Sequence, residues 1–173
     1  MCSVDFVDSV ECSKYRYIYT HIWTIKNFSN ITRNVEKVSP PFSAPDCDDQ
    51  WQLMIRITYD EQLKHDVLGI YLFLLSCDKS NVNQVNSYFT LSVTDKQEKI
   101  VYSWSCYPYR QVSFIANGPG RGERNVATTL GVRNIIDDVD DSLKIQCGII
   151  SYQLSYVPKS YIHKNFYQAN KHY

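Results

Sequence analysis

The chain has 173 residues, a length typical of one domain with its own hydrophobic core. Apolar residues make up 44% and charged residues 21%, which is an ordinary composition for a globular protein. Eighteen Lys and Arg balance eighteen Asp and Glu. The formal net charge is therefore zero, which argues against a nucleic-acid-binding protein, because such proteins need a surplus of Lys and Arg.

The sequence also argues against a membrane protein and an exported protein. The longest apolar run, residues 67–75, is much shorter than the roughly 20 residues of a membrane-spanning helix. The first residues include Asp5, Asp8 and Glu11 and lack the basic cluster of a secretory signal. We therefore expect an intracellular protein, in the nucleus or the cytoplasm, whose six cysteines are reduced thiols.

Three strands are expected in the first third of the chain. Residues 15–25 are rich in aromatic side chains, which favour strands. Residues 38–43 predict a short edge strand, because Pro40 and Pro41 lack the N–H groups that an inner strand must donate. Residues 50–58 alternate apolar and polar side chains, which is typical of a half-buried strand.

The next three expected strands follow in the middle of the chain. Residues 67–75 are apolar on both faces, which favours a central strand covered on both sides. Residues 87–94 repeat the alternating pattern. A polar turn, residues 95–98, then leads into residues 100–107, which we expect to close a hairpin with the preceding strand.

The last part of the chain mixes loops with one strong strand. Residues 116–124 (ANGPGRGER) hold three Gly and one Pro, so they predict an exposed, mobile loop. Residues 125–136 could hold one or two helical turns. Residues 143–149 alternate again, and the strand continues toward residue 157.

The pattern therefore predicts an all-β fold. Seven or eight short strands and no long helix indicate an antiparallel β-sandwich or barrel. We expect an N-terminal extension at residues 1–14, one domain at residues 15–157 and a flexible C-terminal tail at residues 158–173.

Neither catalytic nor metal-binding chemistry is indicated. No CxxC pair occurs among the cysteines, so zinc is disfavoured. The Gly-rich segment lacks the Lys and Ser or Thr of a phosphate-binding loop. None of the four histidines can be placed beside a nucleophile and an orienting acid. We expect no enzyme activity, no cofactor and no metal.

Three segments of the chain carry motifs in a characteristic order. The first is residues 21–29 (HIWTIKNFS), and the second is residues 51–53 (WQL) followed by residues 67–77 (VLGIYLFLLSC). The third is residues 140–147 (DDSLKIQC). Together they resemble the opening strand, the Trp-x-Leu strand with the tyrosine-bearing central strand, and the closing strand of the MATH domain, also called the TRAF-like or meprin-and-TRAF-homology domain. The resemblance covers most of the chain.

The closest branch by resemblance is the speckle-type POZ protein branch, partly because of the run LSCDKS at residues 75–80. The resemblance implies an eight-stranded antiparallel β-sandwich without catalytic activity. In that branch the domain binds a Ser/Thr-rich peptide of a target protein along one edge. A POZ (BTB) domain, which is not present in these residues, then bridges to a cullin-3 ubiquitin ligase.

The resemblance also implies a peptide-binding groove. By residue-by-residue match its members here are Tyr71, Phe89 and Tyr109, and Arg121 and Gly122 are further candidates at a position where this sequence departs from the branch. The segment containing Arg121, Gly122 and Glu123 stands where the branch has a Trp and a Phe that wall an apolar pocket. Because Arg121 replaces an apolar wall with a positive charge, we expect a ligand with an acidic or phosphorylated residue. The alternative function is an extracellular or structural MATH domain that serves oligomer assembly.

Overall fold

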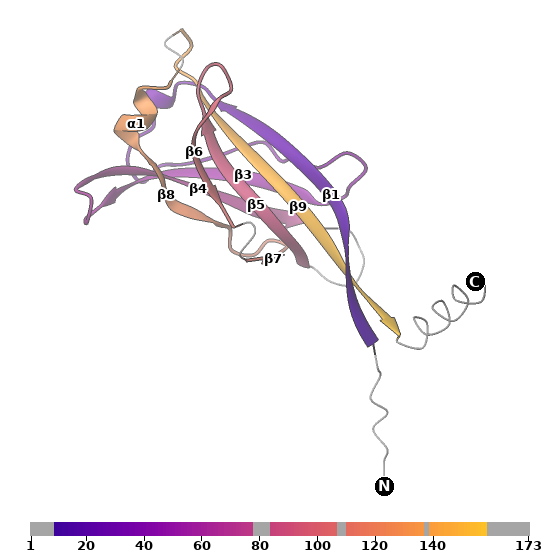
Figure 1. Cartoon of the computed structure of the whole chain (residues 1–173). Coiled ribbons are helices and arrows are strands. Elements are labelled where there is room, and N and C mark those ends of the chain that lie inside the picture. Colours follow the sequence, from indigo (N-terminus) through magenta and orange to yellow (C-terminus); the bar gives the residue numbers. More distant parts are fainter. Residues whose placement is uncertain (1–8, 78–83, 107–109, 137–138, 159–173) are drawn as a thin grey trace, which may run out of the picture.

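The computed structural model describes residues 9–77, 84–106, 110–136 and 139–158, and within them it places nine strands in two antiparallel sheets (Figure 1). One sheet has the order β1-β9-β5-β6, with β7 also paired to β5. Its strands are β1 (Ser9–Ile25), β5 (Gln84–Thr94), β6 (Ile100–Ser105), β7 (Val112–Ile115) and β9 (Leu143–Pro158). The other sheet has the order β2-β3-β4-β8. Its strands are β2 (Glu36–Val38), β3 (Gln50–Asp60), β4 (His65–Ser76) and β8 (Arg121–Thr128).

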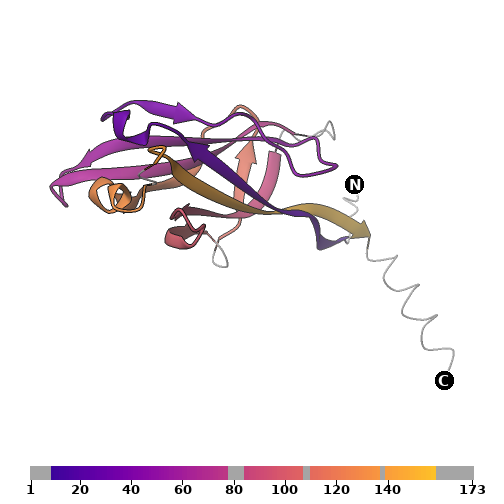
Figure 2. The same cartoon turned by 90° about the horizontal axis from the view of Figure 1, so that it is seen from above.

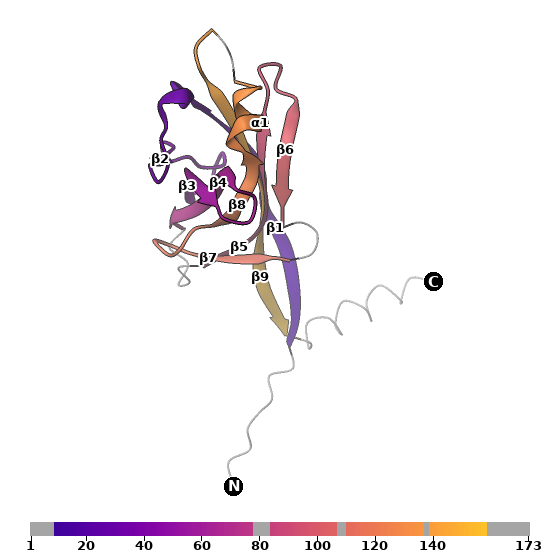
Figure 3. The ribbon, with the colours of Figure 1, turned by 90° about the vertical axis from the view of Figure 1, so that its left-hand side faces the viewer.

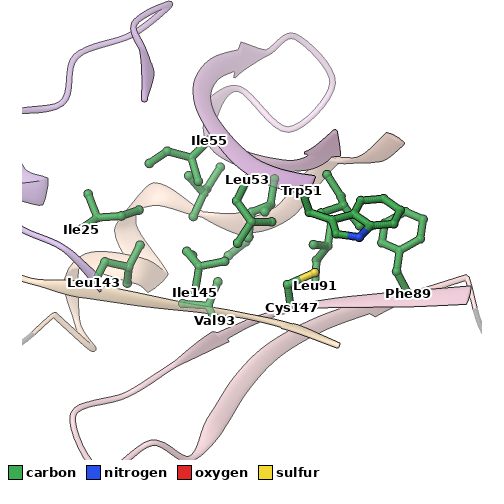
Figure 4. Close-up of a cluster of buried hydrophobic side chains, with 14 of the residues drawn as sticks. Ile25, Trp51, Leu53, Ile55, Phe89, Leu91, Val93, Leu143, Ile145 and Cys147 are labelled. Atoms are coloured by element: carbon green, nitrogen blue, oxygen red, sulfur yellow. The ribbon is translucent and has the colours of Figure 1, made fainter. Parts of the chain in front are cut away.

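The two sheets lie one above the other as the layers of a β-sandwich, which confirms the predicted fold class (Figure 2). Their apolar faces meet in one core. Figure 4 shows Trp51, Leu53 and Ile55 of β3 on one side of this core and residues of β5 and β9 on the other. Several apolar side chains of the alternating segments 50–58, 87–94 and 143–149 that face this core are each at most 1% exposed: Trp51, Leu53, Ile55, Leu91, Val93, Leu143 and Ile145. The period-two alternation therefore identified the buried faces correctly.

Strand β4 is central, as predicted, because it lies between β3 and β8. Its core-facing residues, such as Ile70 and Leu72, are fully buried. Tyr71 and Phe73 on the opposite face are only half-buried. The expectation that both faces are covered is wrong here, because within the described residues no further layer packs over this part of the sheet.

The first two strands differ from their predicted limits. β1 begins at Ser9, before the expected domain start at residue 15, because its first residues pair with the end of β9. β2 covers residues 36–38, so it shares only Val38 with the predicted strand at residues 38–43. The prolines interrupt the strand pairing, and Phe42 then forms an isolated bridge with Trp51. Residues 1–8 and 159–173, which hold much of the expected extension and tail, lie outside the described residues.

Strands β7 and β8 were not predicted, and the described residues hold nine strands where the sequence pattern indicated seven or eight. The prediction that residues 116–124 form a mobile loop is wrong from Arg121 onward, because β8 pairs there with β4. Only a tight turn precedes it, in which the Gly118 N–H donates to the Ile115 carbonyl (2.9 Å) and Asn117 has a left-handed φ of 57°.

The helical turns expected within residues 125–136 are present as α1 (Thr129–Arg133). The Thr128 hydroxyl accepts a hydrogen bond from the Gly131 N–H (3.0 Å), which caps the first turn. Nowhere in the described part of the chain is a helix long and apolar enough to cross a membrane.

A buried hydrogen-bond network ties the two sheets together. The Tyr17 hydroxyl of β1 donates to Asp49 Oδ2 (3.0 Å) and accepts from Trp51 Nε1 (2.9 Å) at the start of β3. The Asp49 side chain has no solvent exposure. Burial and the Asp49 carboxylate raise the pKa of Tyr17 well above its usual value, so the hydroxyl stays protonated in the folded protein.

Replacing Trp51 should test the core directly. We expect Trp51→Ala to lower the free energy of unfolding by about 3–5 kcal/mol, because it leaves a large cavity between the sheets. Urea denaturation followed by circular dichroism would measure the loss. Lys37→Ala, at an exposed position of β2, is the control and should change the stability by less than about 0.5 kcal/mol. Equal effects of the two changes would contradict this account of the core.

The Tyr17 network should make stability depend on alkaline pH. Because the pKa of Tyr17 is raised on folding, the unfolded chain loses this proton first as the pH rises above about 10, and the folded state then loses stability. Tyr17→Phe should cost about 1–3 kcal/mol near neutral pH, since Asp49 and Trp51 lose a partner. The difference in the free energy of unfolding between wild type and Tyr17→Phe, measured by urea denaturation, should be smaller at about pH 11 than near neutral pH. A difference that stays constant or widens would show that the raised pKa is wrong.

Candidate functional site

An open cavity lies where the edges of the two sheets are neighbours. β8 ends the four-stranded sheet and β6 ends the path of the other sheet, and both strands lie on the side seen in Figure 3. The cavity has a volume of about 500 Å3. Its lining includes Phe89, Trp104, Cys106, Arg110, Arg121 and Gly122.

A chain of aromatic rings forms the floor of the cavity and continues into the core. The ring centroids of Phe89 and Trp104 are 5.4 Å apart, and those of Phe89 and Phe114 are 5.3 Å apart in an edge-to-face arrangement. Phe114 in turn meets Trp51 edge to face at 5.0 Å. Such pairs contribute about 0.5–1.5 kcal/mol each beyond their buried area, so the floor is held firmly by the core.

Cys106 closes the floor where β6 ends. Its Sγ accepts a hydrogen bond from the Phe89 N–H (3.1 Å), and its own backbone N–H donates to the Phe89 carbonyl (3.2 Å). Burial raises the pKa of the Cys106 thiol, so the thiol remains protonated near neutral pH. Cys106 is therefore a structural part of the floor rather than a nucleophile.

Gly122 lets β8 approach β4 closely. Gly122 stands opposite Tyr71 in the β4–β8 ladder. A Cβ at this position would overlap the Ile70 carbonyl oxygen and lie 2.7 Å from the Tyr71 Cα. Likewise, a Cβ at Gly120 would overlap the Phe73 ring. Since no described glycine has a positive φ, these two provide space for neighbouring atoms and not a special backbone conformation.

The structure brings three of the five predicted site residues together. Phe89, Arg121 and Gly122 line the cavity. Tyr71 lies beside Gly122 in the ladder, on the face of the sheet that points away from the core. The Tyr71 ring lies over Gly69 of the same strand, where a Cβ would come within 3.0 Å of the ring and 3.1 Å of the hydroxyl. Tyr109 lies outside the described residues.

Two lining residues, Trp104 and Arg110, were not predicted. Trp104 lies on β6 opposite Leu91, so it shares the core-facing side of its sheet. The alternation within residues 100–105 carried this signal, because Tyr102 and Trp104 fall on one face. Arg110 directly follows the predicted Tyr109, but nothing in its local pattern indicates that it reaches the cavity.

The described lining offers aromatic, thiol, hydroxyl, amide and guanidinium groups. The described lining contains neither a histidine nor a carboxylate, so it supplies no general base. Elsewhere His21 stacks on Phe42 with centroids 3.8 Å apart, and burial lowers its pKa. No group of three or more His, Cys, Asp or Glu side chains in the described residues could hold a metal ion.

Comparison with known families agrees with this description. The family model described as the MATH domain matches residues 20–149. The chain belongs to the MATH domain family. The match runs from within β1 to within β9, so both sheets and every described lining residue of the cavity fall inside the MATH domain. MATH domains are protein-interaction modules, which fits a cavity that offers aromatic surface and no catalytic groups.

A pair of glycine substitutions should test how tightly β8 is held in this MATH domain. Gly122→Ala should lower the free energy of unfolding by about 1–3 kcal/mol or more, because its Cβ overlaps backbone atoms of β4. Gly148→Ala is the matched control, since a Cβ there meets nothing within 4 Å. Thermal denaturation of both variants would show the difference. If Gly122→Ala is tolerated as well as Gly148→Ala, β8 does not pack as described.

Proposed function

We propose that this MATH domain binds an extended segment of a partner protein along the free edge of β8. The observation that carries the proposal is the position of the cavity beside that edge. Within the described residues β8 pairs with β4 alone, so no strand covers its other side. The exposed N–H and C=O groups of a sheet edge can pair with an added strand, which is a recurrent mode of peptide binding.

The side chains of such a peptide would alternate between two environments. Those directed toward the core side would enter the cavity over Phe89 and Trp104. Those directed to the other side would pass over Gly122 and meet the Tyr71 ring. Aromatic surfaces are common anchors at interfaces, because they offer a large contact area at a small cost in side-chain entropy. Tyr109, the remaining predicted residue, would add to the same groove.

We extend the proposal to the branch and role that the sequence resemblance implies. The run at residues 75–80 and the match of Tyr71, Phe89 and Tyr109 support a relation to the speckle-type POZ protein branch. In that role the groove would select a substrate inside the cell for a cullin-3 ubiquitin ligase. The contact to the ligase would come from a POZ domain outside these residues.

A peptide selection followed by binding measurements tests this function. Random nine-residue peptides displayed on phage would be selected against the whole chain, and enriched peptides measured by fluorescence polarisation. Trp104→Ala and Tyr71→Ala should each weaken binding more than about tenfold, because truncating an aromatic anchor typically costs 2 kcal/mol or more.

The matched control is Tyr88→Ala. Tyr88 is a half-buried tyrosine beside Ile18 and Ile150 on the outer face of the five-stranded sheet, away from the cavity that holds Trp104. Tyr88→Ala should therefore leave the affinity for the selected peptides within about twofold of the wild-type value. Amide hydrogen exchange should also slow in β8 when the peptide binds. Selected peptides that bind all three variants equally would place the binding surface elsewhere.

A further inference from the structure

We infer that the peptide side chain received by this cavity is anionic, held by the guanidinium groups of Arg110 and Arg121 over the aromatic floor. The inference rests on the proposed function, because it names the kind of ligand for the same groove. The shared chemistry is a carboxylate or a phosphate at the end of a side chain. Acidic residues (Asp and Glu) and phosphorylated residues are its two sources in a protein.

Among the described residues that line the cavity, every charged side chain is positive. Arg110 and Arg121 are the charged members of this lining, and both side chains are exposed. The lining residues beyond those named above are Ser105, Gln111, Val112 and Ser113, none of which is charged. The chain as a whole has a net charge of zero, so this local excess is a feature of the cavity and not of the overall composition.

These two arginines also differ from others in the sandwich. Arg33 pairs with Asp66 at 2.7 Å and lies over the Tyr59 ring at 4.8 Å, and Arg124 donates to the Tyr59 carbonyl oxygen at 3.1 Å. Within the described residues neither Arg110 nor Arg121 has an ion pair or a side-chain hydrogen bond. Their donors are therefore available to a ligand, and a guanidinium group fits a carboxylate or a phosphate through two parallel hydrogen bonds.

The acidic residue nearest to Arg121 in the sequence is engaged outside the cavity. Glu123 follows Arg121 by two positions, but it does not line the cavity. Its Oε1 accepts a hydrogen bond from the Asn125 N–H at 3.1 Å, in the irregular part of β8. The Glu123 carboxylate is thus hydrogen-bonded to the backbone of its own strand.

The floor and the rim together favour a side chain with an apolar body and an anionic end. The half-buried Trp104 offers aromatic surface at the base, supported from below by the buried Phe89 ring, and the arginines stand with Gln111 on the exposed rim. The Ser113 hydroxyl is already engaged, since it donates to Asn86 Oδ1 at 2.6 Å. The arginines are therefore the main donors that the described lining offers to an anion.

Synthetic peptide libraries would test the inference. Fluorescein-labelled nine-residue libraries, degenerate except at the centre, would carry Glu, phosphoserine or phosphotyrosine there. The neutral partners would carry Gln, Ser or Tyr. At least one anionic library should bind about tenfold or more tightly than its neutral partner, and the gain should shrink as NaCl rises from about 50 to about 300 mM. The Glu and phosphorylated libraries distinguish the two sources of the anion.

Three variants test whether the tighter binding of the anionic libraries depends on the cavity. Arg121→Gln and Arg110→Gln should each remove most of it, while Arg133→Gln, an exposed arginine on α1, should retain it. All three positions are exposed, and thermal denaturation would verify that each variant is folded. Equal binding of anionic and neutral libraries, or a gain that survives both cavity variants, would overturn the inference.

The same measurements distinguish a failure of this inference from a failure of the proposed peptide-binding function. If neutral libraries bind, Trp104→Ala abolishes that binding and no anionic gain is seen, the groove binds peptides and only the inference fails. If no library binds the wild-type chain, both the inference and the proposed groove are wrong.

Discussion

The structure depends on one continuous series of contacts between aromatic rings, which begins in the core and ends at the surface. Trp51 packs on Phe114, Phe114 on Phe89 and Phe89 on Trp104. These four rings come from β3, β7, β5 and β6, so both sheets contribute. The same contacts that hold the sheets together therefore fix the floor of the cavity. A ligand would meet a surface that is already ordered, which lowers the entropy cost of binding.

The sequence was informative wherever burial determines the local pattern. Residues 50–58, 87–94 and 143–149 alternate because one face of each strand packs in the core, and this signal survives in the sequence alone. β7 and β8 left no such signal. β7 has only four residues, and the start of β8 is shaped by the approach of β4, a contact between segments distant in the sequence. Glycine at position 122 satisfies that contact but resembles a loop residue when read locally.

The site was predictable to a similar extent. The family resemblance pointed to Phe89, Arg121 and Gly122, which do lie together. Trp104 lies in the same cavity because β6 pairs with β5, and the alternation within residues 100–105 indicated its face. Arg110 reaches the cavity beyond the end of β6, and its position depends on tertiary structure. The availability of the two arginines could not be read from composition either. It is seen only in the structure, where Arg33 pairs with Asp66 and Arg56 with Glu36, whereas within the described residues Arg110 and Arg121 have no ion pair.

The long ladder between β1 and β9 has a mechanical consequence. The two strands are antiparallel, and Ser9 lies opposite Pro158 at the end of the pair (Figure 1). A force that pulls the two ends of the domain apart would therefore load the hydrogen bonds of this ladder one after another, as in a zipper. Strands loaded in this way separate at lower force than strands that are sheared along their length. The ladder would open from residues 9 and 158 inward, before the tension reached the sheet that carries β8.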